Sequence, residues 1–202
     1  RSGCMGSDWM SGVFRTGAVG GLPQSEVTLA ELLKDAGYSS LAIGKWHVGQ
    51  RKEFLPRAQG FDEYFGIPYS VDMGASPWAQ SSPVLPLLHN ENILEQPVDL
   101  STLTRRYHEK AVEFMRGSLN SSTPFLLYLA WSHVHTPDFA SEDFCKTSLR
   151  GRYGDAVEEM DHYIGKTLDA LKDLGGEQDT VVFFTSDNGP WLIKRWSGIR
   201  NL

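Results

Sequence analysis

The sequence predicts an α/β domain in which helices flank a mixed, largely parallel β-sheet. Segments with helical periodicity alternate along the chain with short apolar runs rich in residues that favour strands, and this alternation is typical of layered α/β proteins. The chain has 202 residues, of which 41% are hydrophobic, and this suffices for one sizeable core.

Residues 26–37 are predicted to form the first helix, because Ser25 can cap its start and Gly37 can end it. An apolar run at residues 39–43 follows and predicts a strand. The helix has one apolar face, made by Leu29, Leu32 and Leu33.

The next segments are less regular. Residues 61–69 mix aromatic residues with glycine and proline, which predicts a packed turn region rather than a helix or strand. Residues 75–97 form a long excursion punctuated by prolines. Within it, residues 84–88 and 93–95 are predicted to pair as a hairpin.

The second half of the chain repeats the alternation. Apolar residues recur at helical spacing over residues 101–116, and Gly117 is expected to end that helix. Strands are predicted at residues 125–130 and 181–185, with a helix between them at residues 152–174.

Polar residues follow three of these strands: Lys45 and His47, then His133 and His135, then Asp187 and Asn188. Ligands of open α/β sheets bind beyond the carboxyl ends of the strands, so these side chains are expected to converge. The sequence therefore predicts a metal-assisted anion site.

Asp187 and Asn188 are the predicted cation ligands, because Ca²⁺ and Mg²⁺ select carboxylate and amide oxygens. An Asx turn after a strand is the alternative role for such a pair. Two side chains do not complete the roughly six to eight oxygens that Ca²⁺ takes, and the sequence does not locate the others.

Lys45 and His47 are the predicted anion ligands. They alternate on an extended strand and so point the same way, offering an ammonium and an imidazole to an oxyanion. A solvated lysine and a hydrogen-bonded surface histidine are the alternatives. His135 is predicted to donate a proton to a departing oxygen, and the spacing does not choose between it and His133.

Composition excludes several classes of function. The formal charge of -6 without a basic stripe argues against a nucleic-acid partner. No apolar run approaches the roughly 20 residues of a membrane span, and the N-terminus lacks the order of a signal peptide. Cys4 and Cys145 are too few for a disulfide scaffold. Asn120 begins an N-glycosylation sequon in a polar stretch.

Several longer motifs carry a family resemblance. They are TLAELL at 28–33, IGKWH at 43–47, GFDEYFGIPYS at 60–70, HTP at 135–137 and DNGP at 187–190. In this order they resemble the sulfatase family, in particular its arylsulfatase group, within the alkaline-phosphatase-like superfamily. The resemblance spans residues 20–191 and implies the alkaline-phosphatase-like sulfatase fold.

The resemblance also implies an activity. It implies hydrolysis of the sulfate ester of a small molecule or glycan, using one Ca²⁺ ion and a formylglycine made from cysteine, in the lysosome or outside the cell. The site residues that it implies are Asp187 and Asn188 for the cation, Lys45 and His135 for the sulfate and leaving oxygen, His47 beside the nucleophile, and Ser70 for substrate.

This sequence departs from the family pattern. It has no Cys-x-Pro-x-Arg segment for the nucleophile, no paired aspartates near its start, no matching lysine beyond Asn188, and Val71 where a histidine is common. We therefore expect residues 1–21 to be irregular or displaced, and residues 22–202 to be a catalytic domain incomplete at both ends and inactive alone. The alternatives are a non-catalytic sulfatase-like binding protein, and a phosphatase or phosphodiesterase on the same fold.

Overall fold

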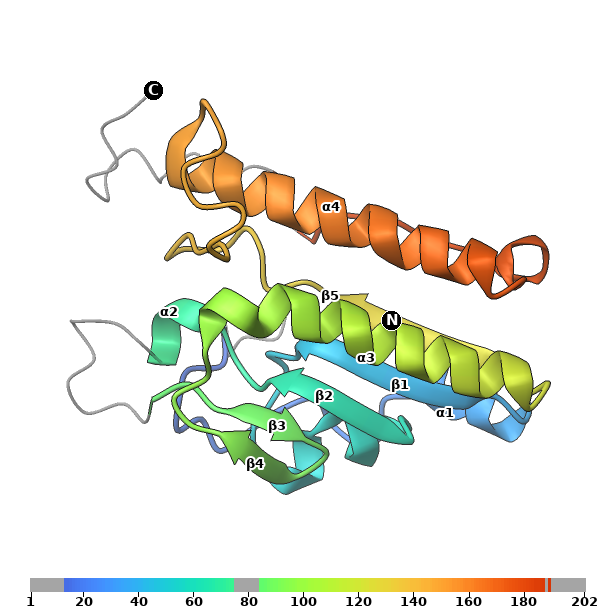
Figure 1. The fold of residues 1–202 in the computed structure, drawn as a ribbon. Helices are drawn as coiled ribbons and strands as arrows, with labels where there is room; N and C mark the ends of the chain where they lie inside the picture. The colour runs from blue at the N-terminus through green and yellow to red at the C-terminus, as the bar shows by residue number, and fades with distance from the viewer. Residues whose placement is uncertain (1–12, 75–83, 188, 190–202) are drawn as a thin grey trace.

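In the computed structural model a five-stranded mixed sheet forms the centre of the molecule, and helices cover both of its faces (Figure 1). The structure describes residues 13–74, 84–187 and 189. None of the helices in these ranges is both long and apolar enough to cross a bilayer.

The sheet has the strand order β4-β3-β2-β1-β5. Strand β1 (Ser39–Lys45) lies between β2 (Glu63–Ile67) and β5 (Phe125–Ala130) and runs parallel to both. The hairpin β3 (Leu87–His89) and β4 (Asn92–Glu95) extends the sheet beyond β2 in antiparallel fashion. A largely parallel mixed sheet is thus confirmed, and a hairpin is present, although its first strand covers residues 87–89 rather than 84–88.

Two glycines allow the parallel strands to approach closely. A Cβ atom on Gly44, whose φ is +101°, would lie 1.8 Å from the carbonyl oxygen of Ala130 in β5. A Cβ atom on Gly66 would lie 2.0 Å from the carbonyl oxygen of Gly44. Side chains at these positions would force β1 away from β5 and β2. Lys45 lies at the end of β1, and His133 and His135 follow β5.

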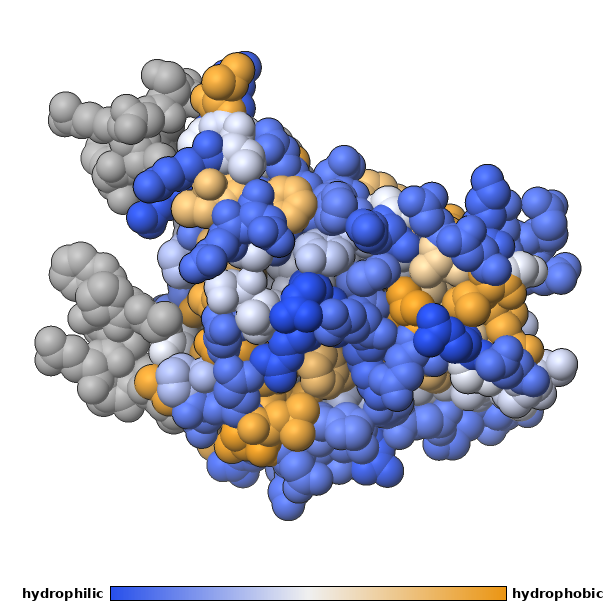
Figure 2. All heavy atoms as spheres, in the orientation of Figure 1, coloured by the Kyte–Doolittle hydropathy of each residue, from blue (hydrophilic) through white to orange (hydrophobic). Residues whose placement is uncertain are grey.

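Three longer helices accompany the sheet: α1 (Leu29–Asp35), α3 (Leu100–Asn120) and α4 (Gly151–Asp173). Shorter elements are α2 (Val71–Gly74) and the 3₁₀ turns η1 (Lys52–Phe54), η2 (Pro56–Gln59) and η3 (Glu177–Asp179). Helix α4 packs along α3 as an outer layer (Figure 1). Hydrophilic side chains predominate on the face shown in Figure 2, which fits a solvent-facing outer layer.

The core lies in two clusters on opposite faces of the sheet, because successive strand residues point to opposite sides. Leu41 and Ile43 of β1 face α3, where they pack near Leu103 and Tyr107. Ala42, between them in sequence, belongs to the other cluster with Ala30, Leu55, Phe61, Tyr64 and Leu88.

The predicted turn region at residues 61–69 is wrong, because residues 63–67 form strand β2 in the interior of the sheet. Tyr64, Phe65 and Ile67 favour extended backbone, and Gly66 is there for the close approach of β1 rather than for a turn.

Two predicted helix ends also differ. Helix α1 begins later than residue 26, with Thr28 as the cap: its hydroxyl accepts from the Glu31 N–H, and the Glu31 carboxylate accepts from the Thr28 N–H at 2.7 Å. Helix α3 continues past Gly117 to Asn120, since a glycine in the last turns only weakens a helix that packing supports.

The predicted strand at residues 181–185 is also wrong. These residues pair with no strand in the described ranges, and Val181, Val182, Phe183 and Phe184 are exposed. A strand needs a neighbour for its backbone hydrogen bonds, and within residues 13–74, 84–187 and 189 the strand β5 is paired along one edge only, with β1.

Candidate functional site

Lys45 and His47 lie at the carboxyl end of β1, beside the end of β2. Lys45 is the last residue of β1. The Trp46 N–H donates to the Ile67 carbonyl at 3.0 Å, and the His47 N–H donates to the Pro68 carbonyl at 3.1 Å. The pairing of the two strands therefore continues past β1 and holds the backbone of Trp46 and His47 against the end of β2.

His47 is not placed by strand alternation, as the sequence had suggested. Its backbone has φ +58°, which is left-handed and bends the chain away from the strand. Its ring nitrogen Nε2 lies 3.0 Å from the Phe14 carbonyl oxygen. This contact orients the imidazole from the N-terminal segment, which no strand pattern predicts.

The charges around these two side chains are coupled. Burial lowers the pKa of the Lys45 ammonium, while the carboxylates of Asp187 and Asp72 act to raise it. Burial is also the main cause that lowers the pKa of His47; the nearby Lys45 and His135 lower it further, and the Phe14 carbonyl and Asp72 oppose them. Lys45, His47 and His135 therefore share one electrostatic environment.

Ser70 joins this group from the end of β2. Its side chain is buried, and its Oγ has no hydrogen-bond partner among the described residues. Buried hydroxyl groups are normally paired. A buried hydroxyl without a partner among the described residues is free to donate to a bound ligand.

The two histidines after β5 have separate environments. His133 is buried between helices: its Nε2 lies 2.9 Å from Thr104 Oγ1 of α3 and 3.4 Å from the buried Glu159 carboxylate of α4. His135 is partly exposed, and its Nδ1 lies 2.8 Å from the Thr136 carbonyl oxygen. The structure thus gives His133 an internal packing role and leaves His135 at the site.

Asp72 is a site residue that the sequence patterns missed. It lies on the short α2, two residues after Ser70, and its Oδ1 is 3.8 Å from Nδ1 of His135. Its only signal in the sequence is its position after Ser70, since α2 is too short to show periodicity.

Asp187 is exposed, yet it acts electrostatically on both Lys45 and Tyr128. It therefore reaches the site without the predicted strand. Asn188 lies outside the described residues. Within the described ranges no three histidine, cysteine or acidic side chains are grouped as metal ligands. Asp187 is thus the described member of the predicted cation-binding pair, and its carboxylate is the kind of oxygen ligand that Ca²⁺ selects.

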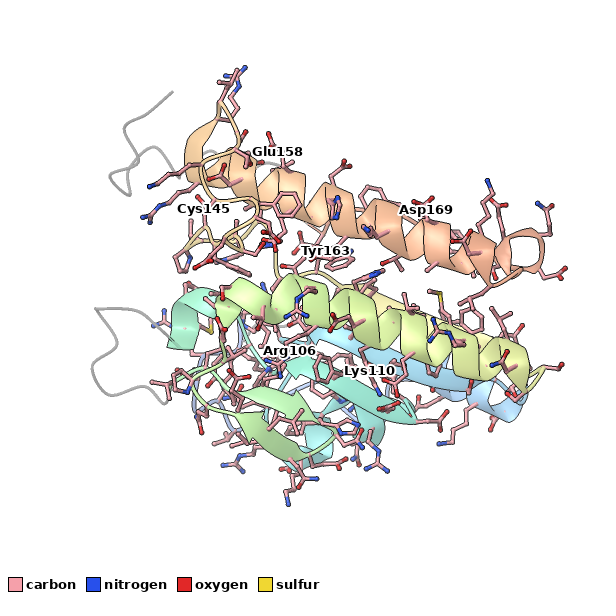
Figure 3. All side chains as sticks on the ribbon, in the orientation of Figure 1. Arg106, Lys110, Cys145, Glu158, Tyr163 and Asp169 are labelled. Atoms are coloured by element: carbon pink, nitrogen blue, oxygen red, sulfur yellow. The ribbon has the colours of Figure 1, made fainter. Side chains whose placement is uncertain are left out.

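The remaining sequence candidates lie apart from this group. Asn120 is the exposed last residue of α3, Cys145 is a free, exposed thiol, and Cys4 is outside the described residues. A hollow of about 370 Å³ lies elsewhere, lined by Arg106 and Lys110 among others. Both are labelled in Figure 3 on the side of α3 toward the sheet, and both form ion pairs with glutamates.

These contacts place the candidate anion ligands at the carboxyl ends of the parallel strands β1 and β2. Comparison with known proteins identifies the family of the chain. The family model described as Sulfatase matches residues 7–198, so the chain belongs to the sulfatase family. Its sheet and helices are those of the alkaline-phosphatase-like fold.

Individual relatives support this assignment. Arylsulfatase G of Canis lupus familiaris is 42% identical over 207 residues, covering 90% of this chain and 38% of that protein. N-acetylgalactosamine-6-sulfatase of Rattus norvegicus is 44% identical over 185 residues, covering 87% and 35%. The crystal structure of Ps i-CgsB superposes with a TM-score of 0.66 at 28% identity, over 81% of this chain and 40% of that one. The chain thus spans well under half the length of these relatives.

Proposed function

We propose that this chain carries the sulfate-binding part of a sulfuric ester hydrolase of the arylsulfatase group. The observation that supports the proposal is the electrostatic coupling of Lys45 and His135 to His47, together with the buried hydroxyl of Ser70, which has no hydrogen-bond partner among the described residues. A sulfate ester carries one negative charge and only accepts hydrogen bonds, so it matches such a set of donors.

Each side chain has a proposed role. Lys45 balances the charge of the sulfate and Ser70 donates a hydrogen bond to it. His135 protonates the departing oxygen, and His47 lies beside the nucleophile. Asp187 and Asn188 would hold a Ca²⁺ ion, which when bound supplies further positive charge at the sulfate.

The proposed nucleophile is a formylglycine made from the cysteine of a Cys-x-Pro-x-Arg segment. No such segment occurs in these 202 residues. We therefore propose turnover for the whole protein, and anion binding for this chain, with residues 22–202 as its catalytic-domain part and residues 1–21 as an irregular segment. The sulfated molecule is proposed to be a small molecule or a glycan, by likeness to N-acetylgalactosamine-6-sulfatase, in a lysosomal or secreted protein glycosylated at Asn120.

The second candidate is a non-catalytic protein that binds a sulfated glycan at the same residues. Sulfate release from an aryl sulfate ester by the whole protein would exclude it. Preference for phosphate over sulfate would instead favour a phosphatase or phosphodiesterase on this fold.

Calorimetric titration of the chain with inorganic sulfate tests the anion site. Lys45→Met is expected to weaken binding about tenfold or more, since a charged hydrogen bond is lost. Lys172→Met is the matched control, because Lys172 is an exposed lysine near the end of α4. Equal affinities of the two variants would contradict the proposed role of Lys45.

A further inference from the structure

Asp72 places a carboxylate among the candidate sulfate ligands. Its Oδ1 lies 3.8 Å from Nδ1 of His135, and its charge acts on both Lys45 and His47. An acidic side chain is unexpected among residues that are to bind an anion. The Asp72 carboxylate must therefore have a role other than direct binding of the anion.

The turn that carries Ser70 fixes the position of Asp72. The Met73 N–H donates to the Ser70 carbonyl at 3.0 Å, which closes the first turn of α2. Oδ1 of Asp72 is itself buried and has no hydrogen-bond partner among the described residues, although the side chain as a whole is 44% exposed. Oδ1 of Asp72 is thus held near His135 without a hydrogen bond to the described residues around it.

Nδ1 of His135 lies within hydrogen-bond distance of the Thr136 carbonyl oxygen, at 2.8 Å, and at ion-pair distance from the Asp72 carboxylate, at 3.8 Å. Because the carbonyl oxygen only accepts and the carboxylate is negatively charged, both favour the hydrogen of the neutral ring on Nδ1. Nε2 is then the nitrogen that exchanges a proton with the ester.

We propose that Asp72 is a positioning residue that fixes the tautomer and ring orientation of His135, and a counter-charge that the incoming sulfate must overcome. The inference rests on the proposed function, in which His135 serves the leaving oxygen. It has two consequences of opposite sign: Asp72 aids the transfer of the proton from His135 and weakens the binding of the anion.

The first test is the imidazole nitrogen spectrum of the 202-residue chain, assigned with His135→Ala. Asp72→Asn is expected to move His135 away from the Nδ1–H form, because an amide group can donate as well as accept. Asp72→Glu is expected to restore it. Asp169→Asn, an exposed change on the outer helix α4 (Figure 3), is the matched control.

The second test is titration of the same proteins with inorganic sulfate. Asp72→Asn is expected to bind sulfate about fivefold more tightly, the effect of removing one nearby like charge in a partly solvated site, and Asp169→Asn is expected to match the wild type. An unchanged tautomer in Asp72→Asn, or weaker sulfate binding, overturns the inference. Failure of the wild type to bind sulfate would count against the proposed function alone, because the tautomer is measured without ligand.

Discussion

His47 lies close enough to Lys45 and His135 for both of them to lower its pKa. Such crowding of positive groups costs free energy in the empty site, and a bound anion offsets it. The buried hydroxyl of Ser70 adds a donor that is not paired with any of the described residues. The site residues therefore favour an anionic ligand through both charge and hydrogen bonding.

The lowered pKa of His47 predicts how sulfate binding depends on pH. The ring is mainly neutral at pH 7, and a bound sulfate favours its protonated form. Binding therefore takes up a proton, so affinity rises as pH falls below about 7, by at most about tenfold per pH unit for one proton. Titration calorimetry between pH 7.5 and 5 in buffers of different ionisation enthalpy measures this.

His47→Gln should show a weaker pH dependence than the wild type, whereas His162→Gln, on the outer helix α4, should keep it. Lys45 and His135 oppose the charge on His47, and the Phe14 carbonyl and Asp72 favour it. The comparison between the two variants therefore separates the contribution of His47 to the pH dependence of sulfate binding from the contributions of these other groups. An identical pH dependence in His47→Gln would contradict the assignment.

At the scale of one element, the start of α1 distinguishes the structure, in which Thr28 caps the helix, from the sequence pattern, which proposed Ser25 as the cap. The Thr28 hydroxyl donates to the Gln59 carbonyl at 2.8 Å and accepts from the Glu31 N–H at 3.2 Å, so it joins the helix to η2. Thr28→Ala is expected to lower the free energy of unfolding by about 1 to 2 kcal/mol. Urea denaturation measures the change.

Ser25→Ala is the control for this prediction. Ser25 is exposed and lies before the helix, so its replacement is expected to change stability by no more than about 0.5 kcal/mol. A larger loss from Ser25→Ala than from Thr28→Ala would mean that the helix begins where the sequence pattern placed it.

Elements with strong local patterns were predictable from the sequence. The periodic segments became α3 and α4, and the apolar runs became β1 and β5. Strand β2 was missed because a glycine such as Gly66 locally suggests a turn. The structure instead requires glycine at this position because the backbone of Gly44, 22 positions away in the chain, lies too close for a side chain. The strand at residues 181–185 was wrongly predicted because apolar character does not supply a pairing partner.

The prediction of the site residues was limited in the same way, because local sequence patterns do not show tertiary contacts. The sequence could place Lys45, His47 and the pair His133 and His135 near one another, because they lie at or after strand ends and parallel strands bring their ends together, but it could not choose between the two histidines. Asp72 and the contact between His47 and the Phe14 carbonyl were not predictable, because both depend on how short irregular segments fold back. Local patterns locate strand ends, and tertiary packing decides what surrounds them.

For the whole molecule, the open edge of β5 and the exposed apolar residues 181–184 predict association. Phe183 is 91% exposed and Phe184 76%, and β5 is paired along one edge only in the described part of the chain. Unpaired edges and contiguous apolar surface promote contact between chains. The isolated chain is expected to be poorly soluble and to self-associate, as measured by sedimentation velocity over a range of concentrations.

Replacing Phe183 and Phe184 with serine should reduce this association. Leu149→Ser is the control, because Leu149 is fully exposed but stands alone. A wild-type chain that stays monomeric and unfolds in one cooperative thermal transition would contradict the prediction.

Asn120 and His135 lie beyond opposite ends of strand β5. Asn120 lies just before β5 begins, where the Ser118 and Ser39 hydroxyls meet at 3.2 Å beside the start of β1. His135 lies just beyond the other end, and the six residues of β5 span about 20 Å. A sugar chain or synthetic tether on Asn120 would therefore project away from the anion site, so the protein immobilised through that residue would present the site to the solution.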